Sequence, residues 1–280
     1  MLAANFTLGY IFWNPDPVLI DFGFYALRWY GVLFATGIAL SYGLVRSGFR
    51  KAGLADRLFD QFAFVIVMGM FVGMRLGHFL FYEPMAFVER PIEVLLPVSF
   101  TPEFHFTGYQ GLASHGGAIG ILLAVGWFAR EHRPVSGAFV LNQLAVVAPL
   151  VGGFIRLGNL MNSEIIGRPT TVPWAFVFAS ADQLPRHPAQ LYEALGYFAI
   201  FVLLFSWQRQ PKFQQQGRLF GVLLVLLFGW RFFVEFFKED QEAFEQALWL
   251  NMGQLLSLPF VIGGALIWYL SRRSETGSHR

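Results

Sequence analysis

Residues 252–270 read MGQLLSLPFVIGGALIWYL and contain no charged side chain. A helix of this length crosses the hydrocarbon core of a bilayer, which is about 30 Å thick. Apolar runs of this kind recur along the chain, at 29–45, 62–82, 114–129, 135–158, 189–207, 219–237 and 252–271. They predict an all-α polytopic membrane protein with seven transmembrane helices. The run at 114–129 is short, so its polar start must lie near the membrane interface.

The composition supports this fold class. Of the 280 residues, 55% are hydrophobic and 14% are charged, and the mean hydropathy is +0.51, whereas about a quarter of a soluble domain is charged. We expect one integral membrane domain over residues 1–272 and a C-terminal tail at 273–280. The net charge of +2 is small and the basic residues are scattered, so we expect a lipid bilayer as surroundings and no nucleic acid as partner.

The residue types exclude several kinds of chemistry. The chain has no cysteine, so it has no disulfide, no thiolate metal site and no cysteine nucleophile of its own. The six histidines show no ligand spacing, and no H-E-x-x-H, G-x-S-x-G or Walker motif occurs. We therefore predict no metal and no cofactor, and neither a zinc protease nor an ATPase.

The distribution of lysine and arginine predicts the orientation in the membrane. Basic residues follow the first, third, fifth and seventh runs, at Arg46, Arg50, Lys51, Arg57, Arg130, Arg133, Arg209, Lys212, Arg218, Arg272, Arg273 and Arg280. The opposite loops are longer, more acidic and poor in lysine. By the positive-inside rule the N-terminus is periplasmic and the C-terminus cytoplasmic, and the longer loops form a periplasmic cap of loops and short helices.

Two further patterns concern the interior of the spans. Gly69, Gly73 and Gly77 form a small-xxx-small face that predicts close packing of the second run. Charged side chains inside spans are costly and are functional candidates, and here they are Arg75, His115, Arg156, Glu193, Arg231 and Glu235. Most of them, and Tyr30, lie toward the outer ends of their runs. Separate helices thus bring polar groups to one level of the membrane.

The two arginines at the outer ends of the fourth and sixth runs allow two interpretations each. Arg231 and Glu235 are four residues apart and can form an intrahelical ion pair, or Glu235 can orient a guanidinium that binds a ligand. Arg156 can reach to the interface as an anchor. Alternatively, with Asn159, Asn162 and Glu164 close by, it can bind an anionic headgroup together with Arg231.

The histidines are also ambiguous. His115 stands before two glycines at a helix start, where it could act as a general base or bond a neighbouring helix. His187, Gln190 and Glu193 lie at another helix start, where capping and packing are as plausible as catalysis.

Seven stretches, taken in order, resemble the bacterial prolipoprotein diacylglyceryl transferases. They are DPVLIDFGFYALRWYGVLFATG (16–37), GMRLGHFLFYEP (73–84), GLASHGGAIG (111–120), RLGNLMNSEIIGRPT (156–170), LPRHPAQLYEAL (184–195), GWRFFVEFFKEDQ (229–241) and NMGQLLSLPFVIGG (251–264). The resemblance covers nearly the whole chain. It implies an enzyme of the bacterial inner membrane, with its active site toward the periplasm. The reaction would move the diacylglyceryl group of phosphatidylglycerol to the lipobox cysteine of a prolipoprotein and release glycerol phosphate.

The resemblance also implies roles for individual residues. Arg156 and Arg231 would bind the phosphate and stabilise the leaving group. His115 would deprotonate the substrate thiol, and the alternative is that the base lies among the residues around Arg231. The substrate-binding set would comprise Tyr30, Gly116, Asn159, Glu164, Gly167, His187, Gln190, Tyr192, Glu193 and Glu235. The sequence departs from the family pattern at Ile155, Ser163, Leu227 and His78, where glycine, glycine, tyrosine and tyrosine are usual.

Two other functions compete with the transferase. A transporter of an anionic solute could use the same arginines, but such proteins often carry inverted repeats, and no repeat is evident here. A lipid-binding structural protein would keep the phosphate site and would not need His115.

Overall fold

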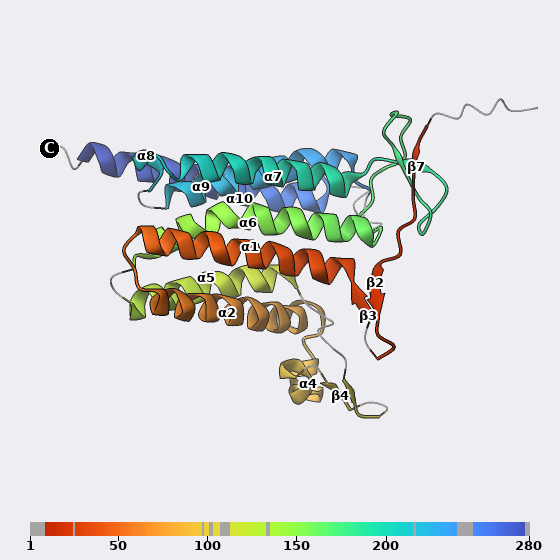
Figure 1. The fold of residues 1–280 in the computed structure, drawn as a ribbon, viewed down its shortest axis with the longest axis horizontal. Helices are drawn as coiled ribbons and strands as arrows, with labels where there is room; N and C mark the ends of the chain where they lie inside the picture. Colours follow the sequence, from red (N-terminus) through yellow and green to blue (C-terminus); the bar gives the residue numbers. More distant parts are fainter. Residues whose placement is uncertain are drawn as a thin grey trace, which may run out of the picture. The chain divides into compact units, whose positions relative to one another are not determined.

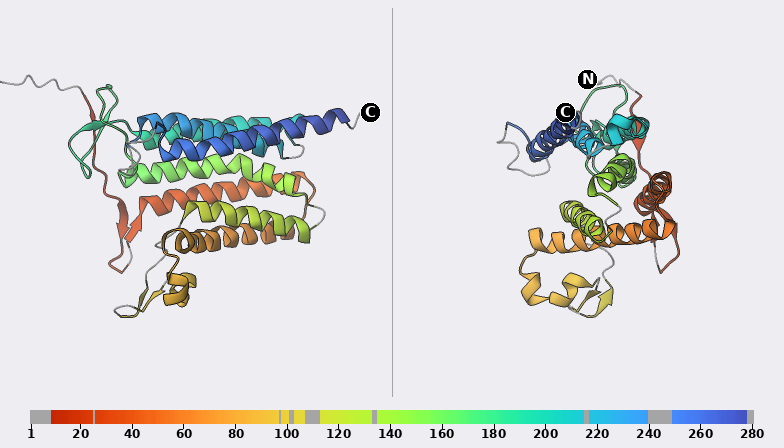
Figure 2. Two further views of the ribbon diagram at one scale, coloured as in Figure 1. Left: turned by 180° about the vertical axis from the view of Figure 1, so that it is seen from behind. Right: turned by 90° about the vertical axis from the view of Figure 1, so that its left-hand side faces the viewer.

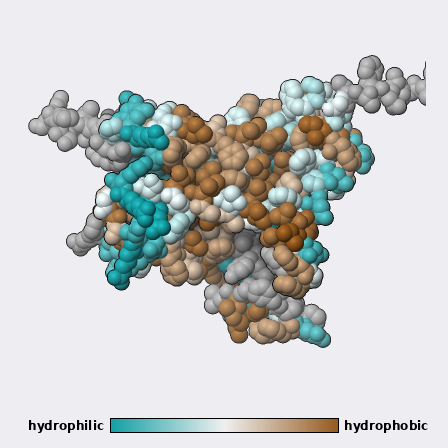
Figure 3. Space-filling view, in the orientation of Figure 1, coloured by the Kyte–Doolittle hydropathy of each residue, from teal (hydrophilic) through white to brown (hydrophobic). Residues whose placement is uncertain are grey.

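The computed structural model describes residues 9–24, 26–96, 98–100, 103–106, 113–132, 135–214, 217–239 and 249–277. The chain is mainly helical, as predicted (Figure 1). Each apolar run forms a long helix, and these are α1 (Trp29–Lys51), α2 (Asp56–Tyr82), α5 (Ser114–Glu131), α6 (Gly137–Met161), α7 (Ala189–Trp207), α9 (Arg218–Val234) and α10 (Met252–Gly277). On the face in Figure 3, hydrophobic side chains cover the middle of the helices, as expected of surfaces that face lipid.

Six of these helices are long and apolar enough to cross a membrane, so the chain is a multi-pass membrane protein. The sequence predicted seven spans, and α5 is not among the six. Its 18 residues extend about 27 Å at 1.5 Å per residue, and both ends are polar. Helix α10 continues to Gly277, into the predicted tail at 273–280, and the division between membrane domain and tail stays a prediction. Residues 278–280 lie outside the described part of the chain, as does Arg133 among the orientation residues.

Short elements connect the long helices. The helical ones are α3 (Ala86–Glu89), α4 (Pro91–Leu95), α8 (Pro211–Gln214) and the 3-10 turn η1 (Glu235–Phe237). The strands are β1 (Ile11–Trp13), β2 (Val18–Asp21), β3 (Ala26–Arg28), β4 (Val98–Ser99), β5 (His105–Phe106), β6 (Phe176–Phe178) and β7 (Pro185–Arg186). They pair as β1-β6-β7, β2-β3 and β4-β5. These strands were not predicted, since two to four residues carry no readable alternation.

The described chain divides into two compact units. The first unit contains residues 1–45 and 141–280, and the second contains residues 46–140. Both boundaries fall inside helices, α1 and α6. The expectation of one membrane domain stays a prediction. Within the first unit, α7, α9 and α10 pack side by side (Figure 2). An apolar core joins α6, α7 and α9, and its buried residues are Ala145, Val146, Tyr197, Ile200, Leu204, Leu219 and Leu223.

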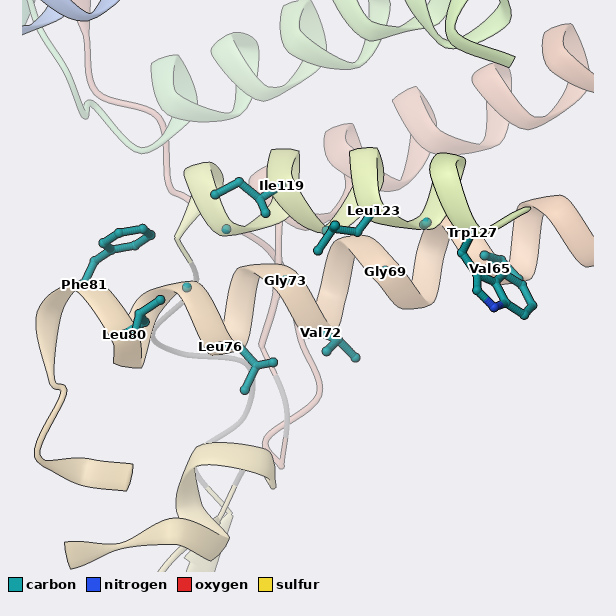
Figure 4. A pocket seen from close by; sticks show the side chains of 14 residues that line it. Val65, Gly69, Val72, Gly73, Leu76, Leu80, Phe81, Ile119, Leu123 and Trp127 are labelled. Atoms are coloured by element: carbon teal, nitrogen blue, oxygen red, sulfur yellow. The ribbon is translucent and has the colours of Figure 1, made fainter. Parts of the chain in front are cut away.

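In the second unit, α2 and α5 pack through glycines. A Cβ on Gly69 would lie 2.9 Å from the carbonyl oxygen of Gly120, and one on Gly77 would lie 2.6 Å from the Cα of Gly116. The predicted close packing of the glycine face is therefore confirmed, and the two helices run antiparallel. A groove of about 460 Å³ follows this seam, and Figure 4 shows Leu76 and Ile119 among its apolar lining.

The first unit has a polar layer at the start of α9. Asn142 of α6 accepts hydrogen bonds from the backbone N–H groups of Leu219 (3.1 Å) and Phe220 (3.4 Å). These N–H groups have no partner within the helix, so Asn142 caps α9 from a neighbouring helix. Arg218 donates to the carbonyl of Lys212 and to the hydroxyl (3.3 Å) and carbonyl (2.9 Å) oxygens of Ser271. We call Asn142, Arg218 and Ser271 the anchoring layer.

Candidate functional site

A cluster of charged residues in the first unit lies where α6 and α9 end and where α7 and α10 begin. Arg156 of α6 forms an ion pair with Glu193 of α7, with 2.8 Å between Nε and Oε2. Glu193 is fully buried. A carboxylate is buried only when it is paired or hydrogen bonded, so Glu193 depends on Arg156 and fixes the guanidinium in turn.

A polar relay holds the other side of Arg156. Its Nη1 donates to the amide oxygen of Asn159 at 3.1 Å. The Asn159 amide nitrogen donates to Glu164 at 3.0 Å, and Asn162 donates to the second oxygen of the same carboxylate at 3.0 Å. Glu164 therefore orients Asn159, which orients Arg156. The guanidinium is also hydrogen bonded to the Tyr197 hydroxyl.

The turn that carries Glu164 explains one departure from the family pattern. The backbone N–H of Glu164 donates to Asn159 O (2.9 Å) and that of Ser163 to Leu160 O (3.1 Å). These two bonds form a Schellman motif, which places its C′ residue in the left-handed region. That residue is Ser163, with φ of 54°, and Ile165 follows at 58°. Glycine fits such a backbone best, so serine at 163 adds strain beside the site.

Arg231 is held more loosely than Arg156. Its Nε lies 3.7 Å from Glu235 Oε1, and its side chain is 34% exposed. Glu235 makes shorter contacts, to Lys238 Nζ at 2.8 Å and to Asn251 Nδ2 at 3.2 Å. Among the described residues Arg231 donates no hydrogen bond. The intrahelical ion pair is therefore a weak account of Arg231, and its donors remain available to a ligand.

Lys238 is the residue that sequence reasoning missed. It is buried, and its ammonium contacts Glu193 (3.1 Å) as well as Glu235 (2.8 Å). It follows η1 in an extended conformation and pairs with Gly167 in a β-bridge. The one available signal was the spacing of three residues between Glu235 and Lys238. We assigned the segment that begins at Lys238 to an acidic outer loop. We call Arg156, Glu193, Lys238, Glu235 and Arg231 the charge chain.

Two tyrosines border the charge chain. The ring of Tyr30 of α1 lies against Gly158, where a Cβ would come within 2.7 Å of the ring. Tyr30 is within electrostatic range of both Arg156 and Glu164. Tyr197 donates to Glu193 at 3.4 Å and lies within range of both arginines of the chain. The structure thus places Tyr30, Asn159 and Glu164 around Arg156, and their predicted role in substrate binding stays a prediction.

The remaining predicted residues of the first unit contact Glu164 or one another. Gln190 is fully buried and donates to the Glu164 carbonyl at 2.5 Å. Tyr192 accepts from Trp174 (2.8 Å) and lies 3.1 Å from His187 Nδ1. Burial lowers the pKa of His187 below its usual value of 6.5, which favours the neutral ring. Substrate binding by these residues stays a prediction.

Gly167 and Arg186 connect these residues to the end of α9. A Cβ at Gly167 would lie 2.7 Å from the Phe237 carbonyl oxygen, so the glycine permits a close approach within the chain itself. Buried Arg186 donates to the Gly167 carbonyl at 3.0 Å and pairs with Asp182 and Glu239. Its guanidinium lowers the pKa of the Asp182 carboxyl. Arg186 was not predicted as a functional residue.

The other predicted residues belong to the second unit. His115 is exposed in the first turn of α5, and neighbouring Gly116 is buried against α2. Arg75 donates to the backbone carbonyls of Glu93 (2.5 Å), Val94 (3.1 Å) and Leu96 (3.1 Å). It therefore secures the end of α4, which accounts for its charge within a span. His78, another departure from the family pattern, lies 3.3 Å from Glu83.

The charge chain has the chemistry of an anion site. Arginine presents a planar fork of donors that stays charged and matches phosphate oxygens. Two such forks lie in one cluster of buried carboxylates, and each keeps donors that the described residues do not occupy. Within the described residues, no group of three or more His, Asp or Glu side chains could hold a metal ion. The absence of a metal stays a prediction.

Residues 17–270 match the sequence model of the family described as prolipoprotein diacylglyceryl transferase. The chain belongs to this family. It is 45% identical to the phosphatidylglycerol–prolipoprotein diacylglyceryl transferase of Tolumonas auensis, over 95% of this chain and 99% of that protein. The enzymes of the same name from Bacteroides fragilis and Chloroherpeton thalassium are 45% and 41% identical, over 94% and 95% of this chain and 96% of each of theirs. The chain is therefore a transferase, and the transporter alternative gains no support.

Proposed function

We propose that this protein transfers the diacylglyceryl group of phosphatidylglycerol to the thiol of a prolipoprotein lipobox cysteine. The observation that carries the proposal is the pair of arginines in the charge chain, within a chain of this family. Arg156 is oriented from two sides, and Arg231 keeps its donors available. A lipid phosphate is the partner that this arrangement fits.

The reaction needs two things from the protein. A thiolate attacks the glyceryl carbon, a C–S bond forms, the C–O bond to the phosphate breaks, and glycerol phosphate leaves with the thiol proton. Arg156 and Arg231 bind the phosphate and stabilise the charge that develops on its leaving oxygen. The substrate supplies the thiol, which agrees with a chain that has no cysteine.

His115 is the proposed general base. A cysteine thiol has a pKa of about 8.5 and is only partly ionised at neutral pH. A neutral imidazole can accept its proton, and the exposed ring of His115 is accessible. Replacing it in His115→Gln should lower the transfer rate, because the thiol then has no base to accept its proton. A transfer rate unchanged by the substitution would exclude His115 as the base.

The proposed topology has seven spans in the bacterial inner membrane, with the site toward the periplasm. Helix α5 supports a seventh crossing because it runs antiparallel to α2 along their glycine seam. Basic residues follow α1, α5, α7 and α10, which favours a cytoplasmic location for those ends. The ends of α6 and α9 that carry the arginines then face the periplasm, under a cap of loops and short elements.

The test is a labelling reaction. Purified protein in micelles is mixed with phosphatidylglycerol and a lipobox peptide, and mass spectrometry follows the peptide. The peptide should gain one diacylglyceryl group, and a matched peptide with serine in place of the cysteine should gain nothing. A cysteine peptide that gains no mass would overturn the proposal.

A further inference from the structure

Glu235 is shared by two cations that lie at different distances. Its Oε1 is 2.8 Å from the Lys238 ammonium and 3.7 Å from Arg231 Nε. The second oxygen accepts from the Asn251 amide at 3.2 Å. Lys238 therefore competes with Arg231 for the same carboxylate oxygen and makes the shorter contact.

The surroundings make this competition strong. Lys238 is 2% exposed and Glu235 is 6% exposed, so water screens their attraction poorly. The side chain of Arg231 is 34% exposed, and of the two cations it makes the longer contact with Glu235. Lys238 also contacts Glu193, the partner of Arg156. One ammonium thus lies between the two carboxylates that face the two arginines.

The net charge of the charge chain fits a ligand with one negative charge. Three cations face two carboxylates, which leaves one positive charge. Glu164, a further carboxylate linked to Arg156 through Asn159, is exposed and accepts hydrogen bonds from the amides of Asn159 and Asn162. A phosphodiester carries one negative charge, so its binding would balance the chain.

We propose that Lys238 is a positioning residue that draws the Glu235 carboxylate away from Arg231 and so keeps the Arg231 guanidinium available for the lipid phosphate. The inference rests on the proposed function. Without the ammonium, Glu235 would close onto Arg231 as a bidentate ion pair, which is the strongest geometry between these groups. The carboxylate would then occupy the donors that the phosphate needs.

The experiment measures kcat and KM for phosphatidylglycerol in the labelling reaction. Lys238→Met should raise KM by about 10- to 100-fold, the equivalent of one charge-assisted hydrogen bond. The double variant Lys238→Met/Glu235→Gln should return KM to the value of Glu235→Gln alone, because a neutral amide does not compete for Arg231. Lys238→Arg should keep KM near the wild-type value. Lys51→Met, which removes an exposed lysine at the end of α1, is the matched control.

The second substitution separates positioning from simple support of the fold. A Lys238→Met variant with wild-type KM would overturn the inference, as would a double variant no better than the single one. If the methionine variant does not fold, Lys238→Gln with and without Glu235→Gln gives the same comparison. Absence of transfer by the wild-type chain would instead contradict the proposed function, so the two failures are distinguishable.

Discussion

The first unit buries polar side chains in two layers, at opposite ends of the same helices. Asn142 and Arg156 are both on α6, and Arg218 and Arg231 are both on α9, so about 20 Å separates the layers at 1.5 Å per residue. In the anchoring layer, Arg218 is 4% exposed and bonds to backbone carbonyls and a serine. In the charge chain, Arg231 is partly exposed and faces a carboxylate that a lysine holds.

The difference distinguishes a structural arginine from one that binds a ligand. An arginine whose donors all meet the protein stabilises the fold and has nothing left to offer. Arg156 is instead oriented by Glu193 and Asn159, Arg231 is held only loosely, and both retain donors. Arg75 in the second unit belongs with Arg218, because three backbone carbonyls accept its hydrogen bonds. A charged residue within a span is therefore insufficient evidence for function. Whether its donors are all bonded to the protein distinguishes a structural arginine from a ligand-binding one.

The largest expected effect comes from removing an arginine of the charge chain. Arg156→Ala should lower the rate of diacylglyceryl transfer by about 100-fold or more, as the loss of a donor to developing charge does in other enzymes. Arg156→Lys should recover only a small part, since an ammonium cannot make the bidentate contact. The labelling reaction measures both. Full activity in Arg156→Lys would show that charge alone suffices.

Removing the arginine of the anchoring layer should lower the stability of the protein and leave the transfer rate unchanged. Arg218→Ala leaves the carbonyls of Lys212 and Ser271 without their donor, which costs about 1–3 kcal/mol for buried groups. We expect a lower unfolding temperature in micelles and an unchanged rate per folded molecule. A lost rate in a protein that stays folded would remove the distinction between the layers.

Much of this arrangement could be predicted from the sequence, and the reasons for the rest are physical. Apolar length was enough to predict each long helix, because a span must satisfy its backbone internally. The partners of Arg75, Arg218 and Lys238 could not be predicted. They are backbone carbonyls or carboxylates on other elements, and no local spacing encodes them.

The short strands and the turn after α6 show the same limit. β1 pairs with β6 across more than a hundred residues of chain, and so short a strand has no pattern of its own. Ser163 was noticed only as a departure from the family pattern. Its left-handed backbone shows why glycine suits that position. Leu227, where tyrosine is usual, packs against the apolar core of the first unit. Nothing in the structure explains Ile155.

A smaller effect concerns the turn that supports the charge chain. Ser163→Gly should raise the free energy of unfolding by about 1 kcal/mol, because glycine adopts a positive φ without strain. Ser206→Gly is the matched control, since Ser206 lies in right-handed helix α7. There the same change should lower stability by about 0.5–1 kcal/mol. Denaturant unfolding in micelles measures both, and equal signs would contradict the assignment of the strain.

The smallest effect is a dependence of stability on pH. The pKa of His187 is lowered in the folded state, so the unfolded chain takes up the proton first as the pH falls. Stability should therefore decrease as the pH falls below about 6.5. His187→Gln removes this contribution, and its unfolding temperature should change less than that of the wild type between about pH 7.5 and 5.5. Parallel curves would show that His187 does not titrate in this way.

The most direct test replaces each of the two arginines of α9 in turn and compares the two variants. Arg231→Ala and Arg218→Ala each remove one guanidinium from α9, and both the transfer rate and the unfolding temperature are measured for each. The charge chain predicts that Arg231→Ala loses transfer to the lipobox peptide and stays folded, while Arg218→Ala loses stability and keeps its rate. An Arg231→Ala protein that transfers diacylglyceryl at the wild-type rate would contradict the account.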